Sequence, residues 1–227
     1  GGISKERKIS LETAKQVNKV LKRGFKTVIS EPNNDLIKKI KTFKPNIIFN
    51  ALHGRFGEDG YIQSILEKLK IKYTHSGVIS SFLAMNKILS KEIFIKNNIL
   101  TPKFIKFSFN NNNKISTKLI KKIEQRLKFP VVIKPINEGS SVDVYICTKK
   151  NLITNLKKLK KYTEIIIESY IAGREIQVAI LGKKKLGAIE LKPKRKFYDY
   201  KAKYSLSAKT EHILPVELEK KKLDEVL

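Results

Sequence analysis

The apolar residues of the first fifty positions change their spacing several times, and each change predicts a new element. Between Ser10 and Gly24 they recur every three or four positions, which predicts a helix with Ser10 as its N-cap and Gly24 as its stop. We expect a short strand at 26–30, a second helix at 35–43 and a buried strand at 47–52. This alternation is typical of βαβ units around a parallel sheet.

Two glycine-containing turns follow expected strands. Residues 53–60 come directly after the strand at 47–52, and Ser76-Gly77 comes after a short strand expected at 71–74. In an open α/β sheet, the turns at the ends of strands are where ligands bind. The sequence therefore predicts a binding site at these turns.

A second unit is expected from about Val78 onward, so that the chain would have two lobes with a cleft between them. Its expected elements are helices near 82–97, 117–128 and 149–161, strands at 104–109, 131–134, 142–147 and 165–169, and a hairpin formed by 175–181 and 186–191.

Composition limits the class of protein. With 227 residues, of which 41% are hydrophobic, the chain can bury a core, which excludes a disordered or collagen-like protein. Cys147 is the single cysteine, so an internal disulfide and a multi-cysteine zinc site are both excluded, and a reducing compartment is indicated. The longest apolar runs are far shorter than the roughly 18 residues of a membrane span, and no signal peptide is recognisable.

The net charge of +27 raises the alternative of a nucleic-acid-binding or membrane-surface protein. Only six of the 48 basic residues are arginine, although base readout and bidentate phosphate contacts favour arginine. Most lysines fall on the polar faces of expected helices, where a solvated surface is the ordinary explanation. The charge therefore does not by itself indicate a specific nucleic-acid partner.

Several charged residues stand at the ends of expected strands. Lys134 precedes the loop 135–141, whose glycine and serines suit a phosphate group, although a lysine beside an ordinary turn would have the same pattern. Glu168 and Glu175 are either ligand-binding carboxylates or partners of nearby lysines. His53 is either functional or a satisfied turn residue.

Taken together, four segments identify a family. In this order along the chain, residues 53–63, 73–77, 134–142 and 197–204 closely resemble D-alanine:D-alanine ligases of the ATP-grasp superfamily, and the likeness runs from residues 1–7 to 212–215. The resemblance implies an α/β ATP-grasp fold with a Rossmann-like, parallel-sheet N-terminal domain. The domains implied are an N-terminal substrate domain at 1–77, a central ATP-grasp subdomain at 78–171 and the start of a C-terminal ATP-grasp subdomain at 172–227.

The resemblance also implies an activity. The family joins two D-alanines with ATP and Mg²⁺ (or Mn²⁺) through an acylphosphate, for peptidoglycan precursors, in the cytoplasm and as a homodimer. A ligase for D-serine or D-lactate as second substrate is the alternative within this fold. A basic nucleic-acid-binding module is the alternative from another class.

By resemblance, specific residues take specific roles. The ATP-binding residues would be three lysines for the phosphates, a loop serine, and two carboxylates for the adenine amino group and the ribose: Lys87, Lys134, Lys203, Ser141, Glu168 and Glu175. In the amino acid site, Glu6 would hold the substrate ammonium group, with Ser140 and Tyr204 hydrogen-bonded to it as the other catalytic residues. His53 would lie near the substrate carboxylates.

The sequence departs from the family pattern at two positions. Asn86 stands where an aspartate is usual, and Asp143 replaces a glycine of the phosphate-covering loop, from which we expect weakened nucleotide binding. The metal ligands are expected beyond Leu227, with none in this chain, and the first strand is expected before Gly1. We therefore expect a fragment that is inactive by itself.

Overall fold

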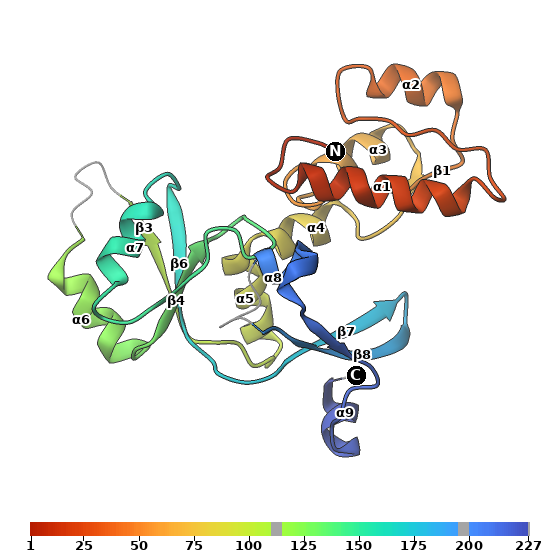
Figure 1. The fold of residues 1–227 in the computed structure, drawn as a ribbon. Helices are drawn as coiled ribbons and strands as arrows, with labels where there is room; N and C mark the ends of the chain where they lie inside the picture. Colours follow the sequence, from red (N-terminus) through yellow and green to blue (C-terminus); the bar gives the residue numbers. More distant parts are fainter. Residues whose placement is uncertain (110–114, 195–199, 227) are drawn as a thin grey trace.

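The structure is a computed structural model that describes residues 1–109, 115–194 and 200–226. Figure 1 shows an N-terminal part, a central part built on an antiparallel sheet, and a C-terminal hairpin with short helices. Residues 197–199, which begin the last of the family-like segments, lie outside the described residues.

The N-terminal part contains three helices and two short parallel strands. In chain order these are α1 (Arg7–Leu21), α2 (Leu36–Phe43), β1 (Ile47–Ile48), α3 (Tyr61–Lys68) and β2 (Lys72–Tyr73). The strands pair Ile47 with Lys72, and a small buried cluster of Ile40, Ile62 and Leu66 joins α2 to α3. The glycine-containing turn 53–60 therefore lies between β1 and α3, as the sequence predicts.

The prediction of a strand at 26–30 is wrong. No strand is assigned there, and the side chains of Phe25, Val28 and Ile29 are 70%, 56% and 49% exposed. Within the described residues β1 pairs only with β2, so this apolar segment has no strand beside it to supply backbone hydrogen bonds. The strand predicted at 47–52 is likewise reduced to two residues.

The helical stretches predicted near 82–97 are two helices, the first of which begins earlier than expected. They are α4 (Val78–Met85) and α5 (Lys87–Lys96), and Asn86 between them is extended, with φ −88° and ψ 108°. The Asn86 side chain accepts hydrogen bonds from the backbone N–H groups of Ile88 and Leu89 at 3.0 and 3.2 Å. Since asparagine caps a helix as well as aspartate does, this departure from the family pattern leaves the start of α5 intact.

The central sheet has the strand order β3-β6-β4-β5 and is antiparallel throughout. Its strands are β3 (Phe104–Ser108), β4 (Val131–Pro135), β5 (Tyr145–Cys147) and β6 (Glu164–Ser169), with helices α6 (Thr117–Arg126) and α7 (Leu152–Lys158). Fully buried residues of one sheet face, such as Val131, Ile133 and Ile167, pack with Ile123 of α6 and Leu156 of α7. The opposite face therefore carries Lys134 and Glu168, because strand residues alternate between faces.

The loop after β4 bends in a way that shortens the strand predicted at 142–147. Ser140, Ser141 and Asp143 have φ values of 45°, 59° and 55°, in the left-handed region that strands do not use. The strand β5 consequently begins only at Tyr145. With this backbone conformation, the Ser140 hydroxyl reaches the Glu6 carboxylate.

The C-terminal part is a three-stranded antiparallel sheet of β7 (Glu175–Leu181), β8 (Lys184–Lys192) and β9 (Glu211–Ile213). Short helices α8 (Tyr200–Tyr204) and α9 (Lys220–Val226) flank β9 in the chain. In Figure 1 helix α8 lies near α4 and α5, whereas the C-terminus lies below the β7–β8 hairpin, beside α9. The predicted hairpin is confirmed, with a tighter turn than expected.

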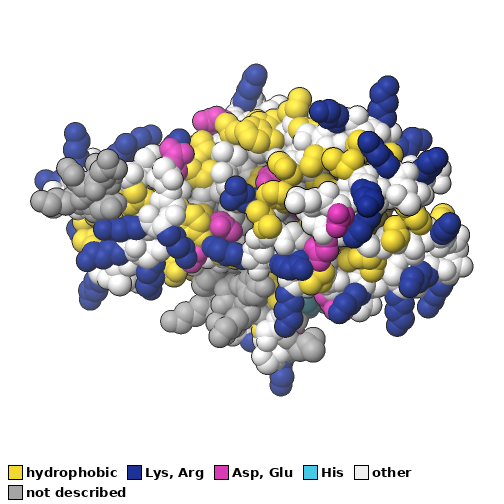
Figure 2. Space-filling model, turned by 90° about the horizontal axis from the view of Figure 1, so that it is seen from above, with side chains coloured by type: hydrophobic (Ala, Val, Ile, Leu, Met, Phe, Trp, Pro, Cys, Tyr) yellow, Lys and Arg dark blue, Asp and Glu magenta, His cyan; other side chains and the backbone are white. Residues whose placement is uncertain are grey.

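The distribution of charge on the surface bears on the alternative of a nucleic-acid-binding protein. On the face shown in Figure 2, Lys and Arg side chains lie around the whole outline, with apolar and acidic side chains between them, and form no single basic stripe. Within the described residues, no helix is long and apolar enough to cross a membrane.

Candidate functional site

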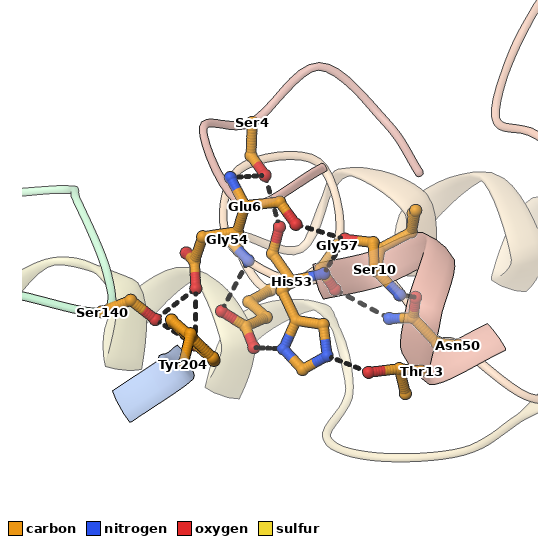
Figure 3. Close-up of polar contacts among 12 residues, drawn as sticks. Ser4, Glu6, Ser10, Thr13, Asn50, His53, Gly54, Gly57, Ser140 and Tyr204 are labelled. Carbon is orange, nitrogen blue, oxygen red and sulfur yellow. Dashed lines mark hydrogen bonds and ion pairs between the residues drawn. The ribbon is translucent and has the colours of Figure 1, made fainter. Parts of the chain in front are cut away.

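Three side chains from distant parts of the sequence meet at one carboxylate (Figure 3). Glu6 stands just before α1, is 5% exposed, and accepts a short hydrogen bond from the Ser140 hydroxyl at its Oε1 atom. The Tyr204 hydroxyl lies 2.6 Å from Ser140 Oγ and 3.3 Å from the same Glu6 oxygen. The contact therefore joins the N-terminal part, the loop after β4 and helix α8.

Two glycines leave room for the other oxygen of Glu6. A Cβ atom on Gly54 would lie 2.7 Å from Glu6 Oε2, and one on Gly139 would lie 2.9 Å from it. Both distances are shorter than van der Waals contact allows. Glycine is therefore required on both sides of the carboxylate for it to stay in this position.

Hydrogen bonds hold the turn 53–60 against the start of α1. The Ser4 hydroxyl donates to the His53 carbonyl at 2.7 Å and accepts from the Glu6 backbone N–H at 3.1 Å. The His53 N–H donates to Ser10 Oγ at 2.9 Å. The backbone on both sides of Glu6 is thus tied to the turn, which limits its movement.

The His53 ring is partly exposed and has neighbours on both nitrogens. Nε2 lies 2.9 Å from the Thr13 hydroxyl, and Nδ1 lies 3.9 Å from a Glu58 carboxylate oxygen. Glu58 also accepts the Gly54 N–H at 2.8 Å. The ring thus lies between Thr13 of α1 and Glu58 of the turn, and both interpretations of His53, functional or satisfied turn residue, stay open.

Lysines gather on the other side of the loop 135–141. The Lys87 ammonium group, at the first turn of α5, donates to the carbonyls of Ile136 and Glu138. Burial, together with the nearby charge of Lys134, lowers the pKa of Lys87 to about 8. Because Ser140 follows Glu138 by two residues, one loop connects this lysine to the Glu6 carboxylate.

Glu168 forms ion pairs with two lysines, Lys134 and Lys91. Lys134 Nζ lies 2.6 Å from Glu168 Oε2, and Lys91 Nζ lies 3.2 Å from Glu168 Oε1. The first pair follows from sheet register, because Glu168 is opposite Val132, two residues before Lys134 on the same face. The alternative that Glu168 pairs with lysines is therefore confirmed for the structure as it stands.

Lys203 and Glu175 complete the charged group. Burial lowers the pKa of Lys203, while the negative charges of Glu175 and Glu6 act in the opposite direction. Burial raises the pKa of Glu175, and the charge of Lys203 opposes that shift. Lys203 also acts electrostatically on Lys87, so α8 brings a third lysine within range of the other two.

Asp143 points toward cations of its own. Its carboxylate lies 2.9 Å from Lys161 Nζ and 3.3 Å from Lys5 Nζ, and it accepts a hydrogen bond from Tyr162. Burial alone would raise the pKa of Asp143, but these three partners lower it to about 2. The carboxylate is thus already compensated, which removes the electrostatic reason for expecting weaker nucleotide binding.

The geometry combines two kinds of binding chemistry. Buried carboxylate and hydroxyl groups suit an ammonium-bearing substrate, and converging lysines suit a polyphosphate. The described residues contain no group of three or more His, Cys, Asp or Glu that could hold a metal ion. A site that places an anionic and a cationic substrate on either side of one loop is suited to phosphoryl or acyl transfer between them.

Comparison with known proteins agrees with this chemistry. Residues 93–227 match the family described as "D-ala D-ala ligase C-terminus". A "D-alanine--D-alanine ligase" of Pelagibacter ubique (strain HTCC1062) is 65% identical over 227 residues, which are all of this chain and 74% of that protein. The chain belongs to the D-alanine:D-alanine ligase family.

Solved structures of the family share its fold. The D-alanine:D-alanine ligase of Bacillus anthracis superposes with a TM-score of 0.81 at 33% identity, over all of this chain and 73% of that one. The structure of the same ligase complexed with ATP gives a TM-score of 0.78 at 30% identity, over all of this chain and 72% of that one. The ATP-grasp fold is therefore confirmed, while the domain boundaries at 77 and 171 stay predictions.

The structure brings most of the predicted residues into two neighbouring groups, but the sequence analysis missed two members and one contact. Lys91 and Lys5 received no role, and Gly139 was considered only for a phosphate and not for its contact with Glu6. Lys91 follows Lys87 by four positions, so that both lie on one face of α5, and this spacing is the signal that could have found it.

Proposed function

We propose that this chain carries the site for ATP-dependent ligation of two D-alanines to D-alanyl-D-alanine. The single observation that carries the proposal is the loop 135–141, which connects Lys87 through two carbonyls to Ser140 and Glu6. A phosphate bound by the lysines would lie next to an amino acid bound at the carboxylate. The family membership of the chain supports the same reaction.

The reaction needs two steps because a carboxylate is a poor electrophile. A carboxylate oxygen of the first D-alanine attacks the γ-phosphorus of ATP, ADP leaves, and an acylphosphate forms. The amine of the second D-alanine then attacks the carbonyl carbon of the acylphosphate and loses a proton. Phosphate leaves and carries with it one oxygen of the first D-alanine's carboxylate. Positioning and charge neutralisation supply most of the catalysis of phosphoryl transfer.

In this proposal Lys87, Lys134 and Lys203 hold the ATP phosphates, with Ser141 in the covering loop. Their ammonium groups offset phosphate charge without redistribution of solvent, because the site is partly buried. Lys134 must leave Glu168 to do so, and its side chain, at 22% exposed, is the more accessible of the two lysines at this carboxylate. Loss of one lysine would therefore weaken ATP binding and slow the first step.

Two carboxylates receive the nucleoside. Glu168 accepts the adenine amino group and Glu175 the ribose hydroxyls, since each is a hydrogen-bond acceptor when ionised. Glu168 lies at the end of β6 and Glu175 at the start of β7. The short connection between these strands thus spans the nucleoside.

In the amino acid site, Glu6 holds the ammonium group of the first D-alanine. Ser140 and Tyr204 fix the Glu6 carboxylate and so join α8 to the N-terminal part, which closes the site and excludes water that would hydrolyse the acylphosphate. His53 lies near the substrate carboxylates, with Thr13 and Glu58 orienting its ring.

Mg²⁺ is expected from the family, where it neutralises phosphate charge. The described residues provide no cluster of metal ligands, so no step here is assigned to the metal. A cytoplasmic location and a homodimer are likewise proposed from the family alone.

The test is product formation. D-alanine and ATP are incubated with the 227-residue chain and with the longest reading frame that contains it, and products are identified by mass spectrometry. The proposal predicts D-alanyl-D-alanine and ADP in equal amounts from D-alanine and none from L-alanine. Preferential formation of a product with D-serine or D-lactate would instead support the alternative ligases, and no product from either protein would contradict the proposal.

A further inference from the structure

Lys91 has no assigned role, yet it is among the most buried charged residues of the protein. Its residue exposure is 5%, and it stands on α5 facing the sheet end where Glu168 lies. Its ammonium group contacts Glu168 Oε1 at 3.2 Å, Thr101 Oγ1 at 2.7 Å and the Pro102 carbonyl at 2.8 Å. The group also lies 5.1 Å from the centre of the Phe104 ring. Every donor of this ammonium group is therefore engaged within the protein.

The two lysines that contact Glu168 differ in side-chain exposure and in the number of their other partners. The Lys91 side chain is 7% exposed and that of Lys134 is 22% exposed. Lys91 has two further oxygen partners and an aromatic neighbour that keep it in place, whereas no other hydrogen bond or ion pair of Lys134 has been found in the described residues. Lys134 can consequently move toward a bound phosphate while Lys91 stays.

If Lys91 were absent, movement of Lys134 toward the phosphates would leave Glu168 without a cation. The Glu168 side chain is 6% exposed, and a buried carboxylate that loses its only cation is strongly disfavoured as an ion. It would then turn toward solvent or another cation, and in its new position it would present a poorer acceptor to an amino group. A permanent second cation prevents this.

We infer that Lys91 is a positioning residue that keeps the Glu168 carboxylate paired with a cation and oriented toward the nucleotide base when Lys134 transfers to the phosphates. The inference rests on the proposed function, in which Glu168 receives the amino group of adenine. Lys91 does not touch the nucleotide and acts only through Glu168. Its removal should therefore affect recognition of the base and spare recognition of the phosphates.

The experiment compares binding of ATP with binding of inosine triphosphate, whose base has a carbonyl oxygen in place of the amino group. Affinities are measured by titration calorimetry on the full chain and on its Lys91→Met variant. We expect wild type to prefer ATP, and Lys91→Met to bind ATP ~10-fold or more weakly while its affinity for inosine triphosphate hardly changes. The ratio of the two affinities thus moves toward one.

Further variants separate a positioning role from a purely structural one. Lys91→Arg restores a cation and should recover part of the preference, and Lys96→Met removes an exposed lysine of the same helix and should change nothing. In a Glu168→Gln background, Lys91→Met should have no further effect on the ratio, because its route of action is gone. If Lys91→Met alone folds poorly, Lys91→Arg, which keeps a cation at this position, takes its place in the comparison of the two affinities.

The outcomes distinguish the two proposals. If wild type prefers ATP but Lys91→Met lowers both affinities equally, or neither, the positioning role is wrong and the proposed function stands. If wild type binds the two nucleotides equally or binds neither, the nucleotide part of the proposed function fails and the inference fails with it.

Discussion

Ser140 and Glu6 are separated by 134 positions in the sequence, and their side chains share one hydrogen bond. The bond closes a contact between the loop after β4 and the start of α1, with the Tyr204 hydroxyl as its third member at 2.6 Å from Ser140. Three segments must therefore be in place before the proposed amino acid site is complete. This requirement makes the contact a sensitive point for substitutions.

Tyr204 is expected to influence the choice of second substrate. Its hydroxyl contacts Ser140 and Glu6, and the resemblance to the family associates a tyrosine here with D-alanine rather than a hydroxy acid. We predict that Tyr204→Phe raises the share of D-alanyl-D-lactate when D-alanine and D-lactate compete. The product ratio is read by mass spectrometry, and an unchanged ratio would count against the role.

Gly139→Ala should impair activity more than stability. The new Cβ would lie 2.9 Å from Glu6 Oε2, and the Glu6 side-chain end can move aside at little cost to folding. The carboxylate would then lie out of position, and we expect kcat/KM for D-alanine to fall by ~10- to 100-fold with little change in Tm. Gly24→Ala, where a Cβ meets nothing within 4 Å, is the matched control and should retain full activity.

Nucleotide affinity should decrease as the solution becomes alkaline. The pKa of Lys87 is lowered to about 8, mainly by burial, so this group is an ammonium below that pH and a neutral amine above it. Because phosphate favours the ammonium form, ATP affinity should fall above pH 8, with a slope that approaches ~10-fold for each pH unit. Titration calorimetry between pH 7 and 9.5 measures the effect.

A Lys87→Arg variant provides the control for this pH profile. Its guanidinium stays charged over the whole range, so its ATP affinity should be nearly independent of pH. Identical profiles for the variant and for wild type would show that another group is responsible.

Asp143→Asn should weaken the fold but not nucleotide binding. Partners that include Lys5 and Lys161 lower the pKa of Asp143 to about 2 in the folded protein, so its contribution to stability is present above about pH 4 and is lost as the pH falls toward 2. We predict that the variant loses ~1 kcal/mol of unfolding free energy at pH 7, and that the difference disappears by about pH 2.

The same variant should bind ATP within about twofold of wild type, because the native carboxylate is already compensated. Asparagine keeps the shape of the side chain and tolerates the left-handed backbone at this position. A Glu124→Gln change at an exposed ion pair with Lys149 serves as the control for stability. Much tighter ATP binding by Asp143→Asn would restore the original view that this charge opposes the nucleotide.

The sequence predicted the elements whose apolar periodicity is strong. Helix α6 and strands β4 and β6 occur within one or two residues of their predicted bounds, because their apolar positions coincide with the buried core. The strand predicted at 26–30 fails because strand formation depends on a neighbour that local pattern cannot show. The late start of β5 was equally hidden, since left-handed serine and aspartate residues leave no glycine signal.

The candidate site was predicted only in part. Resemblance located Glu6, Ser140 and Tyr204, and the structure places them in contact. Lys91 was missed because lysines are frequent on the helices of this chain, so its four-residue spacing from Lys87 did not stand out, and burial is what sets it apart. The orientation of Asp143 was missed for a similar reason, since the positions of Lys5 and Lys161 depend on the tertiary fold.

The most direct test of the ligase site follows the oxygen that is transferred. D-alanine labelled with ¹⁸O in its carboxylate is incubated with ATP and the longest reading frame that contains the chain, and the phosphate and nucleotide products are analysed by mass spectrometry. Because the carboxylate attacks the γ-phosphorus, the account predicts one labelled oxygen in each released phosphate and none in the nucleotide. Unlabelled phosphate, or label found in AMP, would contradict it.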